Sequence, residues 1–263
     1  LMELTVEDVL GTPVVGLSAR NLFITEGAVP VKEVSVVLPG SAPRPLSVVI
    51  LVEDSPELDS FDKELSLAIE NIMGVLGPGT RITIVFAREE ATVEAEFGQF
   101  DRERIQKLIQ RRGDPTWKLD RGVRTAVTEL LPERGRKAIV FLGSGTVRDT
   151  AFGLYSLQEV TAYCRNNGVK FYPVYLGASQ KNQEIEYIMR ETGGKSYLYF
   201  DPEGLKTLYR EIAAAKSSTY VVRYTSPSQS DFGLTYIPLE VQVLHYKRSG
   251  RDESGYFGPL DND

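Results

Sequence analysis

The sequence is poor in the residues that build disulfide frameworks, cysteine-based metal sites and histidine-based active sites. Its 263 residues include one cysteine, one histidine and one tryptophan. A single cysteine excludes an internal disulfide bond and a zinc site built from cysteines. Cys164 lies on the apolar side of a predicted helix, so we expect it to be a buried structural thiol.

The chain also lacks an excess of basic residues. Thirty Lys and Arg residues against 36 Asp and Glu residues give a formal net charge of −6. A nucleic-acid surface needs concentrated positive charge, so we expect no nucleic-acid partner. The sequence shows no signal-peptide pattern and no apolar run long enough to span a bilayer, so we expect no membrane insertion of this segment.

The middle of the chain alternates strand-like and helical patterns. Four runs that are apolar almost throughout are typical of parallel strands buried on both faces: 46–52, 81–87, 137–143 and 169–177. We therefore predict an α/β fold with a doubly wound, mostly parallel sheet and helices on both faces. Residues 90–98 follow the second run too closely for a crossover helix, which predicts an antiparallel edge strand.

The two ends of the chain have a different pattern. Residues 1–38 and 218–246 hold short alternating strands broken by glycine and proline. Isolated strand pairs are marginally stable in water, so we predict that both ends fold together as a small β-sandwich with the α/β domain inserted. The predicted domains are 46–216 for the α/β domain, and 1–45 with 217–263 for the sandwich.

Several segments are similar, in order and spacing, to those of a known family. They are SVVILV (47–52), GPGTRITIVFAREEATVEAEFG (77–98), KAIVFLGSG (137–145) and GVKFYPVYLG (168–177). Through them, residues 46–216 resemble a von Willebrand factor A domain, and the flanks are similar to those of a related bacterial family. Members of that family are typically exported. The resemblance implies a periplasmic or cell-surface location and a non-catalytic adhesion or interaction module with a protein partner.

The resemblance also implies a metal-ion-dependent adhesion site. Such a site would lie at the C-terminal edge of the sheet, where open α/β sheets place their ligand crevice. The family pattern is Asp-x-Ser-x-Ser after the first strand, a threonine after the second helix and an aspartate after the fourth strand. Their oxygen atoms hold a divalent cation, and a ligand carboxylate completes its coordination shell.

In this sequence the pattern is degenerate. Ser55 and Thr116 match it, whereas Glu53, Glu57 and Ser144 replace an aspartate, a serine and an aspartate. Mg²⁺ requires near-ideal octahedral oxygens, which the longer Glu53 and the added Glu57 disturb. We therefore expect no cofactor, and a remnant in which Ser55, Thr116 and Ser144 form hydrogen bonds with one another. The alternative is a Mg²⁺ or Ca²⁺ site at Glu53, Ser55 and Thr116, in an adhesion domain that binds an acidic ligand group.

Without a metal, the loops 53–59, 113–118 and 143–149 are expected to bind the protein partner directly. The candidate contact residues lie in these loops: Asp54, Trp117, Lys118 and Arg148. The cations Lys118, Arg121 and Arg148 can pair with the acidic cluster or with a partner carboxylate. Trp117 has two open interpretations, an exposed binding residue or a lid folded over the core.

A catalytic function is the remote alternative. Ser144, Asp201 and His245 occur in the chain order of an α/β-hydrolase triad. The stretch FLGSGT, however, lacks the glycine two residues before the serine that a nucleophile elbow requires. His245 also falls in the other predicted domain. We therefore predict that the protein is not an enzyme.

Overall fold

The computed structural model divides the chain into two compact units. One comprises Arg44–Ala214, and the other comprises Leu1–Pro43 together with Ala215–Asp263. The structure describes residues 2–9, 14–37, 45–76, 79–95, 97, 102–109, 113–133, 135–177, 181–201, 204–213, 219–228 and 235–257. The predicted domain limits at 46 and 216 fall at or beside segments outside these ranges, so these limits stay a prediction.

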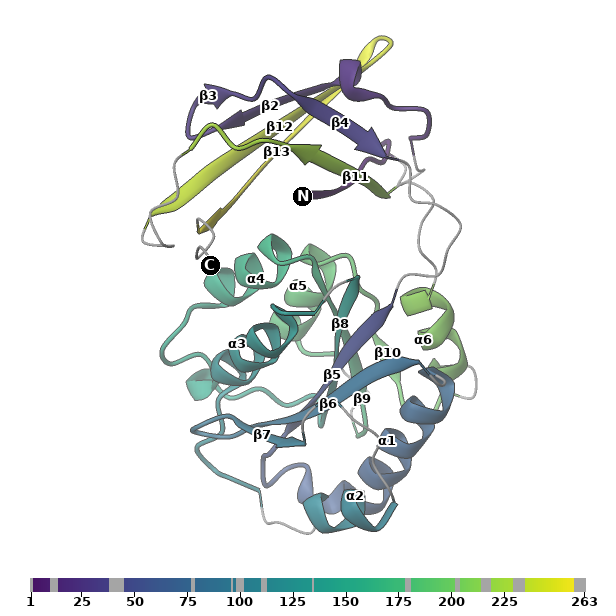
Figure 1. Cartoon of the computed structure of the whole chain (residues 1–263). Coiled ribbons are helices and arrows are strands. Elements are labelled where there is room, and N and C mark those ends of the chain that lie inside the picture. The colour runs from purple at the N-terminus through teal and green to yellow at the C-terminus, as the bar shows by residue number, and fades with distance from the viewer. Residues whose placement is uncertain are drawn as a thin grey trace. The chain divides into compact units, whose positions relative to one another are not determined.

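A six-stranded sheet forms the centre of the larger unit (Figure 1). Its spatial order is β10 (Tyr197–Leu198), β9 (Val169–Tyr175), β8 (Arg136–Gly143), β5 (Leu46–Glu53), β6 (Thr80–Ala87) and β7 (Thr92–Ala95). Neighbouring strands run parallel, except that β7 pairs antiparallel with β6. The predicted parallel sheet with an antiparallel edge strand is thus confirmed.

Helices cover both faces of this sheet. They are α1 (Asp62–Leu76), α2 (Arg102–Ile109), α3 (Leu119–Leu130), α4 (Leu157–Asn166), α5 (Gln183–Glu191) and α6 (Gly204–Ala213). Three short 3-10 turns accompany them: η1 (Ala19–Asn21) in the smaller unit, and η2 (Asp59–Phe61) and η3 (Asp149–Ala151) in the larger one. Within the described residues, no helix has the length and apolar character needed to cross a membrane.

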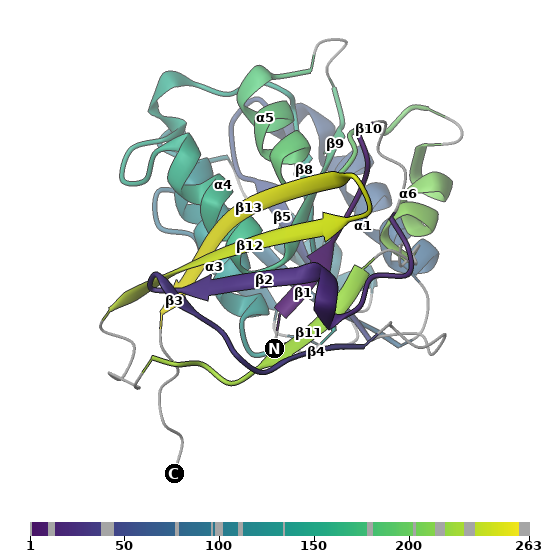
Figure 2. The same cartoon turned by 90° about the horizontal axis from the view of Figure 1, so that it is seen from above.

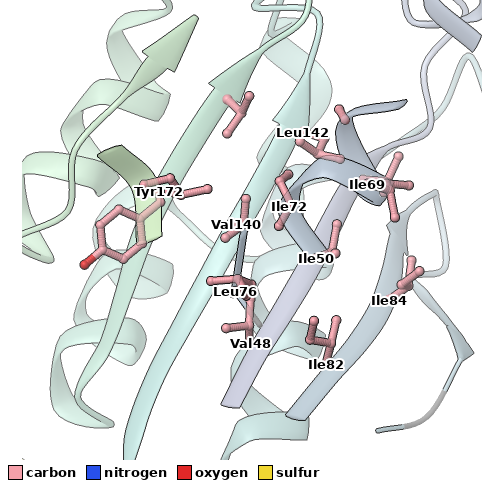
Figure 3. Packing of buried hydrophobic residues seen from close by; sticks show 14 of the residues in the cluster. Val48, Ile50, Ile69, Ile72, Leu76, Ile82, Ile84, Val140, Leu142 and Tyr172 are labelled. Carbon is pink, nitrogen blue, oxygen red and sulfur yellow. The ribbon is translucent and has the colours of Figure 1, made fainter. Parts of the chain in front are cut away.

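The alternation of side chains along β5 produces two hydrophobic cores. Val48 and Ile50 point to one face, where Ile69 and Ile72 of α1 pack (Figure 3), and residues of α2 and α6 belong to the same cluster. Val49 and Leu51 point to the other, where residues of α3, α4 and α5 pack. All eight residues of β5 are buried, which explains why six of them are apolar, the exceptions being Ser47 and Glu53.

Two antiparallel sheets form the smaller unit (Figure 2). One has the order β1 (Met2–Thr5), β11 (Thr219–Tyr224) and β4 (Val34–Val37). The other has the order β13 (Arg248–Phe257), β12 (Tyr236–His245), β2 (Leu22–Glu26) and β3 (Val29–Pro30). Each sheet therefore pairs strands from both ends of the chain, as the sequence predicts.

One hydrophobic cluster takes residues from both of these sheets. Ile24 of β2, Tyr220 of β11 and Val241 of β12 belong to it. The buried Tyr220 hydroxyl donates to the carbonyl oxygen of Val14 at 2.9 Å and accepts from the backbone N–H of Leu17 at 3.2 Å. Its polar atom is therefore satisfied inside the cluster.

Candidate functional site

The predicted site residues lie at the carboxyl ends of the central strands. Glu53 ends β5, and Ser144 directly follows β8. Val52 of β5 pairs with Leu142 of β8, so the parallel register brings Glu53 beside the residues that follow Leu142. Thr116 lies in the turn that precedes α3. Three loops, named here by their ranges 53–61, 113–118 and 143–156, together form the site.

Close backbone packing joins the first two loops. The backbone N–H of Asp114 donates to the carbonyl oxygen of Asp54 at 2.7 Å, and that of Gly113 donates to Asp59 Oδ1 at 2.8 Å. A Cβ atom added at Gly113 would lie 2.2 Å from the carbonyl carbon of Ser55. Glycine is therefore required at this contact.

The carboxyl group of Glu53 is fully buried and organises two of the predicted residues. Its Oε1 accepts hydrogen bonds from the Ser55 hydroxyl and, at 2.7 Å, from the Ser144 hydroxyl. Its Oε2 accepts from the backbone N–H of Ser144 at 2.9 Å. A Cβ atom at Gly143 would come within 2.7 Å of Oε2, so that glycine leaves room for the longer acid.

This environment changes the acidity of Glu53. Burial raises its pKa to about 7, although the hydrogen bonds from Ser55 and Ser144 lower it; the nearby charge of Glu57 raises it further. Near neutral pH the group is therefore close to the midpoint of its titration. A group in this state is a weaker ligand for a hard cation than a fully ionised aspartate.

Thr116 takes other partners. Its hydroxyl donates to Asp114 Oδ1 at 2.6 Å and lies 3.2 Å from Glu89 Oε2, and its backbone N–H donates to Asp114 Oδ1 at 2.8 Å. The arrangement thus differs from the expected hydrogen bonds among Ser55, Thr116 and Ser144. Each hydroxyl has turned to a neighbouring carboxyl group, because charged acceptors form the stronger hydrogen bonds.

The guanidinium group of Arg148 bridges the three loops. Nε donates to Glu57 Oε1 at 3.1 Å, and Nη2 donates to the same oxygen. Nη1 donates to the carbonyl oxygen of Pro115 at 3.2 Å. Partial burial raises the pKa of Glu57, but the hydrogen bonds and charge of Arg148 outweigh it and hold that pKa below its ordinary value. Glu57, placed where the family pattern has a serine, is therefore the anion of an internal ion pair.

Asp54 belongs to a second internal network. Its side chain is 8% exposed, and Arg88 Nε donates to its Oδ2. Arg88 Nη1 donates to Thr92 Oγ1 at 2.8 Å and to Glu94 Oε1 at 2.5 Å. Burial raises the pKa of Asp54, while Arg88 lowers it, and the result is a raised pKa. The structure therefore places Asp54 inside the protein and not on the contact surface that the sequence suggested.

The other candidate contact residues differ in exposure. Trp117 is 1% exposed and packs in the core cluster that α3 covers, which corresponds to the lid interpretation and not to the exposed one. Lys118 is half-buried, and its Nζ donates to the carbonyl oxygen of Thr150 at 2.6 Å. Arg148, with a side chain that is 40% exposed, is the candidate that solvent reaches best.

The sequence analysis missed Asp120, a fully buried acid in the first turn of α3. Its Oδ2 accepts hydrogen bonds from the backbone N–H groups of Gly153, Leu154 and Tyr155 at 3.0, 2.8 and 2.9 Å. Its Oδ1 accepts from the N–H of Arg121 at 2.7 Å. Asp120 therefore anchors loop 143–156 to α3. The helix dipole alone explains an acid in the first turn of a helix, and nothing in the sequence reveals partners more than thirty positions away.

The donor groups do not fit a divalent cation. Such an ion needs several oxygen atoms that converge on one point. Here the Glu53 carboxyl group accepts three hydrogen bonds, and the Thr116 hydroxyl donates to Asp114 of its own loop. The guanidinium group of Arg148 pairs with the Glu57 carboxyl group. Among the described residues, no group of three or more His, Cys, Asp and Glu side chains is placed to hold a metal ion.

The geometry around Ser144 also differs from that of a catalytic serine. Its hydroxyl donates to Glu53 and accepts from the backbone N–H of Thr146 at 3.1 Å. His245 ends a strand of the smaller unit, where its ring lies 4.5 Å from that of Tyr246. In the part of the chain that the structure describes, no hydrogen bond joins Ser144 to a histidine.

No protein-family model matches the sequence, and no curated protein matches it either. Among solved structures, the chain is similar to a von Willebrand factor type A protein from Catenulispora acidiphila, with 11% identity, a TM-score of 0.49, and coverage of 91% of this chain and 70% of that one. An aerotolerance-related membrane protein from Bacteroides fragilis shows 13% identity, a TM-score of 0.48, and coverage of 64% and 98%. Proximal thread matrix protein 1 from the mussel byssus, in a structure whose metal-ion-dependent adhesion site holds zinc, shows 14% identity and a TM-score of 0.49. The match covers 73% of this chain and 49% of that one.

The strand order decides the fold of the larger unit. A parallel sheet whose first strand, β5, lies at its centre, one antiparallel edge strand and helices on both faces are all present. The larger unit therefore has the von Willebrand factor A-like α/β fold that the sequence predicts.

Proposed function

We propose that the protein is a non-catalytic, metal-independent protein-interaction module of the adhesion type. Its partner would bind at the three loops at the carboxyl edge of β5 and β8. We further propose an exported location, with the two sheets of the smaller unit forming a β-sandwich that supports the larger unit. The location rests on the family resemblance of the sequence.

The observation that carries the proposal is the position of Arg148. Its guanidinium group contacts both of the other loops, through Glu57 and through the carbonyl oxygen of Pro115. A positive charge that belongs to the chain itself thus pairs with Glu57, one of the positions at which the resemblance implies metal ligands. Arginine is also enriched among the residues that dominate protein interfaces.

The rigidity of loop 143–156 supports an interaction function. Asp120 holds three consecutive backbone N–H groups of this loop, and Lys118 holds the carbonyl oxygen of Thr150. Leu154 is 61% exposed on the same loop. A surface that is already ordered loses less conformational entropy when a partner binds.

Thermal unfolding in EDTA and in Mg²⁺, Mn²⁺ or Ca²⁺ tests metal independence. The single Trp117 is buried in the larger unit, so its fluorescence follows the unfolding of that unit. A cation at a hundred times its dissociation constant stabilises the native state by about 2.7 kcal/mol, which corresponds to roughly 5–10 °C for a unit of this size. We expect a melting temperature that stays within about 1 °C of the EDTA value for every cation.

Two substitutions provide the control. Ser55→Ala removes a hydroxyl of the site, whereas Thr128→Ala removes an exposed helix hydroxyl that donates to the carbonyl oxygen of Arg124. A cation-dependent rise in melting temperature that Ser55→Ala abolishes and Thr128→Ala preserves would refute metal independence. It would show that the site binds a cation and would favour the metal-dependent alternative.

A further inference from the structure

We propose that Arg148 takes the place of the metal ion as the cation that receives the partner, and that the partner presents a carboxylate group to it. The inference rests on the proposed function and names the chemistry of the partner. The sequence suggested several cations for this role. The structure selects one of them by its contacts, its exposure and its position between the loops.

The first argument is the number of donors that Arg148 retains. A guanidinium group has five N–H donors. Nε and one N–H of Nη2 donate to Glu57, and one N–H of Nη1 donates to the carbonyl oxygen of Pro115. Within the described part of the chain, no hydrogen bond engages the other N–H of Nη1 or of Nη2. A carboxylate can accept two such donors, which gives a charge-assisted pair.

The second argument is preorganisation. The carbonyl oxygen of Arg148 accepts the backbone N–H of Ala151 at 2.9 Å, and Asp120 holds the residues that follow. Both the backbone and the end of the Arg148 side chain are therefore fixed before a partner arrives, yet 40% of the side chain stays accessible. Binding then costs less conformational entropy than it would for a free surface arginine.

The third argument is the distribution of charge along the sheet edge. Loop 143–156 follows β8, and Glu89 and Glu90 follow β6, on the opposite side of β5. Glu90 pairs there with Arg121. On the β8 side, Lys118 lies within reach of loop 143–156 and adds a second positive charge. A carboxylate that approaches Arg148 from this side meets the cations of Arg148 and Lys118, and among the described residues Glu57 is the acid with which Arg148 pairs.

Glu57 competes with the incoming carboxylate for the guanidinium group. The side chains of Glu57 and Arg148 are 31% and 40% exposed, and exposed ion pairs contribute little, typically about 0.2–1 kcal/mol. Arg148 can therefore share its donors between Glu57 and a second carboxylate at little cost. It follows that Arg148 and Glu57 affect carboxylate binding with opposite signs, which no general effect on the fold would produce.

The experiment titrates the full chain with sodium acetate at constant ionic strength, balanced with sodium chloride, at pH 7.5 in EDTA. Backbone amide signals of Glu57 and Thr146 and the Nε–H signal of Arg148 report binding. We expect saturable shifts in the wild type, none in Arg148→Gln, and binding about two- to fivefold tighter in Glu57→Gln. Arg148→Lys keeps the charge but not the paired donors, so we expect binding several-fold weaker than in the wild type.

Arg121→Gln is the matched control. Arg121 lies at the same edge and also pairs with an acid and a backbone carbonyl oxygen. Its substitution should leave the acetate affinity unchanged. Linear shifts without saturation, or saturable shifts that survive in Arg148→Gln, would overturn the inference. Because the titration contains EDTA, its outcome is independent of the cation series that tests metal independence.

Discussion

The buried acid Asp120 offers the sharpest test of how loop 143–156 is held. Asp120→Ala removes the acceptor of four backbone N–H groups, three of which belong to Gly153, Leu154 and Tyr155. Asp120→Asn keeps the shape of the side chain but removes its charge. If the carboxylate fixes the loop, both changes should destabilise the larger unit, and alanine should do so more strongly.

The contacts give the size of the effect. A hydrogen bond to a charged group contributes about 1.5–3 kcal/mol. Gly153 and Leu154 are exposed, so water replaces part of what they lose. We therefore expect a total of about 3 kcal/mol for Asp120→Ala and about half of that for Asp120→Asn. For a unit of this size, 3 kcal/mol corresponds to a fall in melting temperature of about 6–12 °C.

Two measurements are needed. Trp117 fluorescence gives the melting temperature of the larger unit, and amide hydrogen exchange shows whether Gly153, Leu154 and Tyr155 lose protection before the rest of the unit. Glu90→Gln, at a side chain that is 85% exposed, is the control and should change stability by less than about 0.5 kcal/mol. If the melting temperature of the Asp120→Ala variant lay within 2 °C of the wild-type value, and the same amides stayed protected from hydrogen exchange, the anchoring role would be refuted.

Two further changes test the site from the inside. Glu53→Gln should stabilise the protein at pH 8. The pKa of Glu53 is about 7 in the folded protein, above its ordinary value of 4.5, so the folded state favours the protonated acid. The free energy of unfolding of the wild type therefore falls as pH rises from about 4.5 to 7, by at most about 3 kcal/mol. Denaturation from pH 5 to 8 should therefore give a stability difference that grows with pH, and a constant difference would contradict it. Gly113→Ala should lower the free energy of unfolding by about 2–4 kcal/mol, because the added Cβ atom would lie 2.2 Å from the backbone of Ser55. Gly153→Ala is the control and should be tolerated, because its added Cβ atom would have its nearest neighbour at 3.5 Å. Equal melting temperatures of the two variants would contradict this prediction.

The sequence predicts the sheet well because strands that are buried on both faces consist mostly of apolar residues. All residues of β5 are buried, and five consecutive apolar residues, 48–52, precede Glu53. The antiparallel β7 was predictable because the connection from β6 is too short for a helix. The pairing of the two chain ends was predictable for a different reason, since neither end can bury its strands alone.

The site was less predictable because its contacts join residues far apart in the sequence. The residue types at Glu53, Ser55 and Ser144 indicated a hydrogen-bonded remnant, but not that Thr116 would turn to Asp114. Tryptophan in a loop fits an exposed contact and a buried lid equally well, and packing decides between them. Arg148 was one of several cations in the sequence, and the fold distinguishes it by placing its end group between two other loops.

A divalent cation site works because its acids have no other partner and need the ion to offset their repulsion. In this protein Glu53, Asp54 and Glu57 already have partners within the chain. Ser55 and Ser144 donate hydrogen bonds to Glu53, whose pKa burial raises to about 7, Arg88 pairs with Asp54, and Arg148 pairs with Glu57. These internal partners lower the electrostatic need for a metal ion at the loops, which is the basis of the proposed metal independence. A positive charge fixed to the chain cannot be lost to a chelator, so a partner that depends on Arg148 would bind equally well whether or not divalent cations are present.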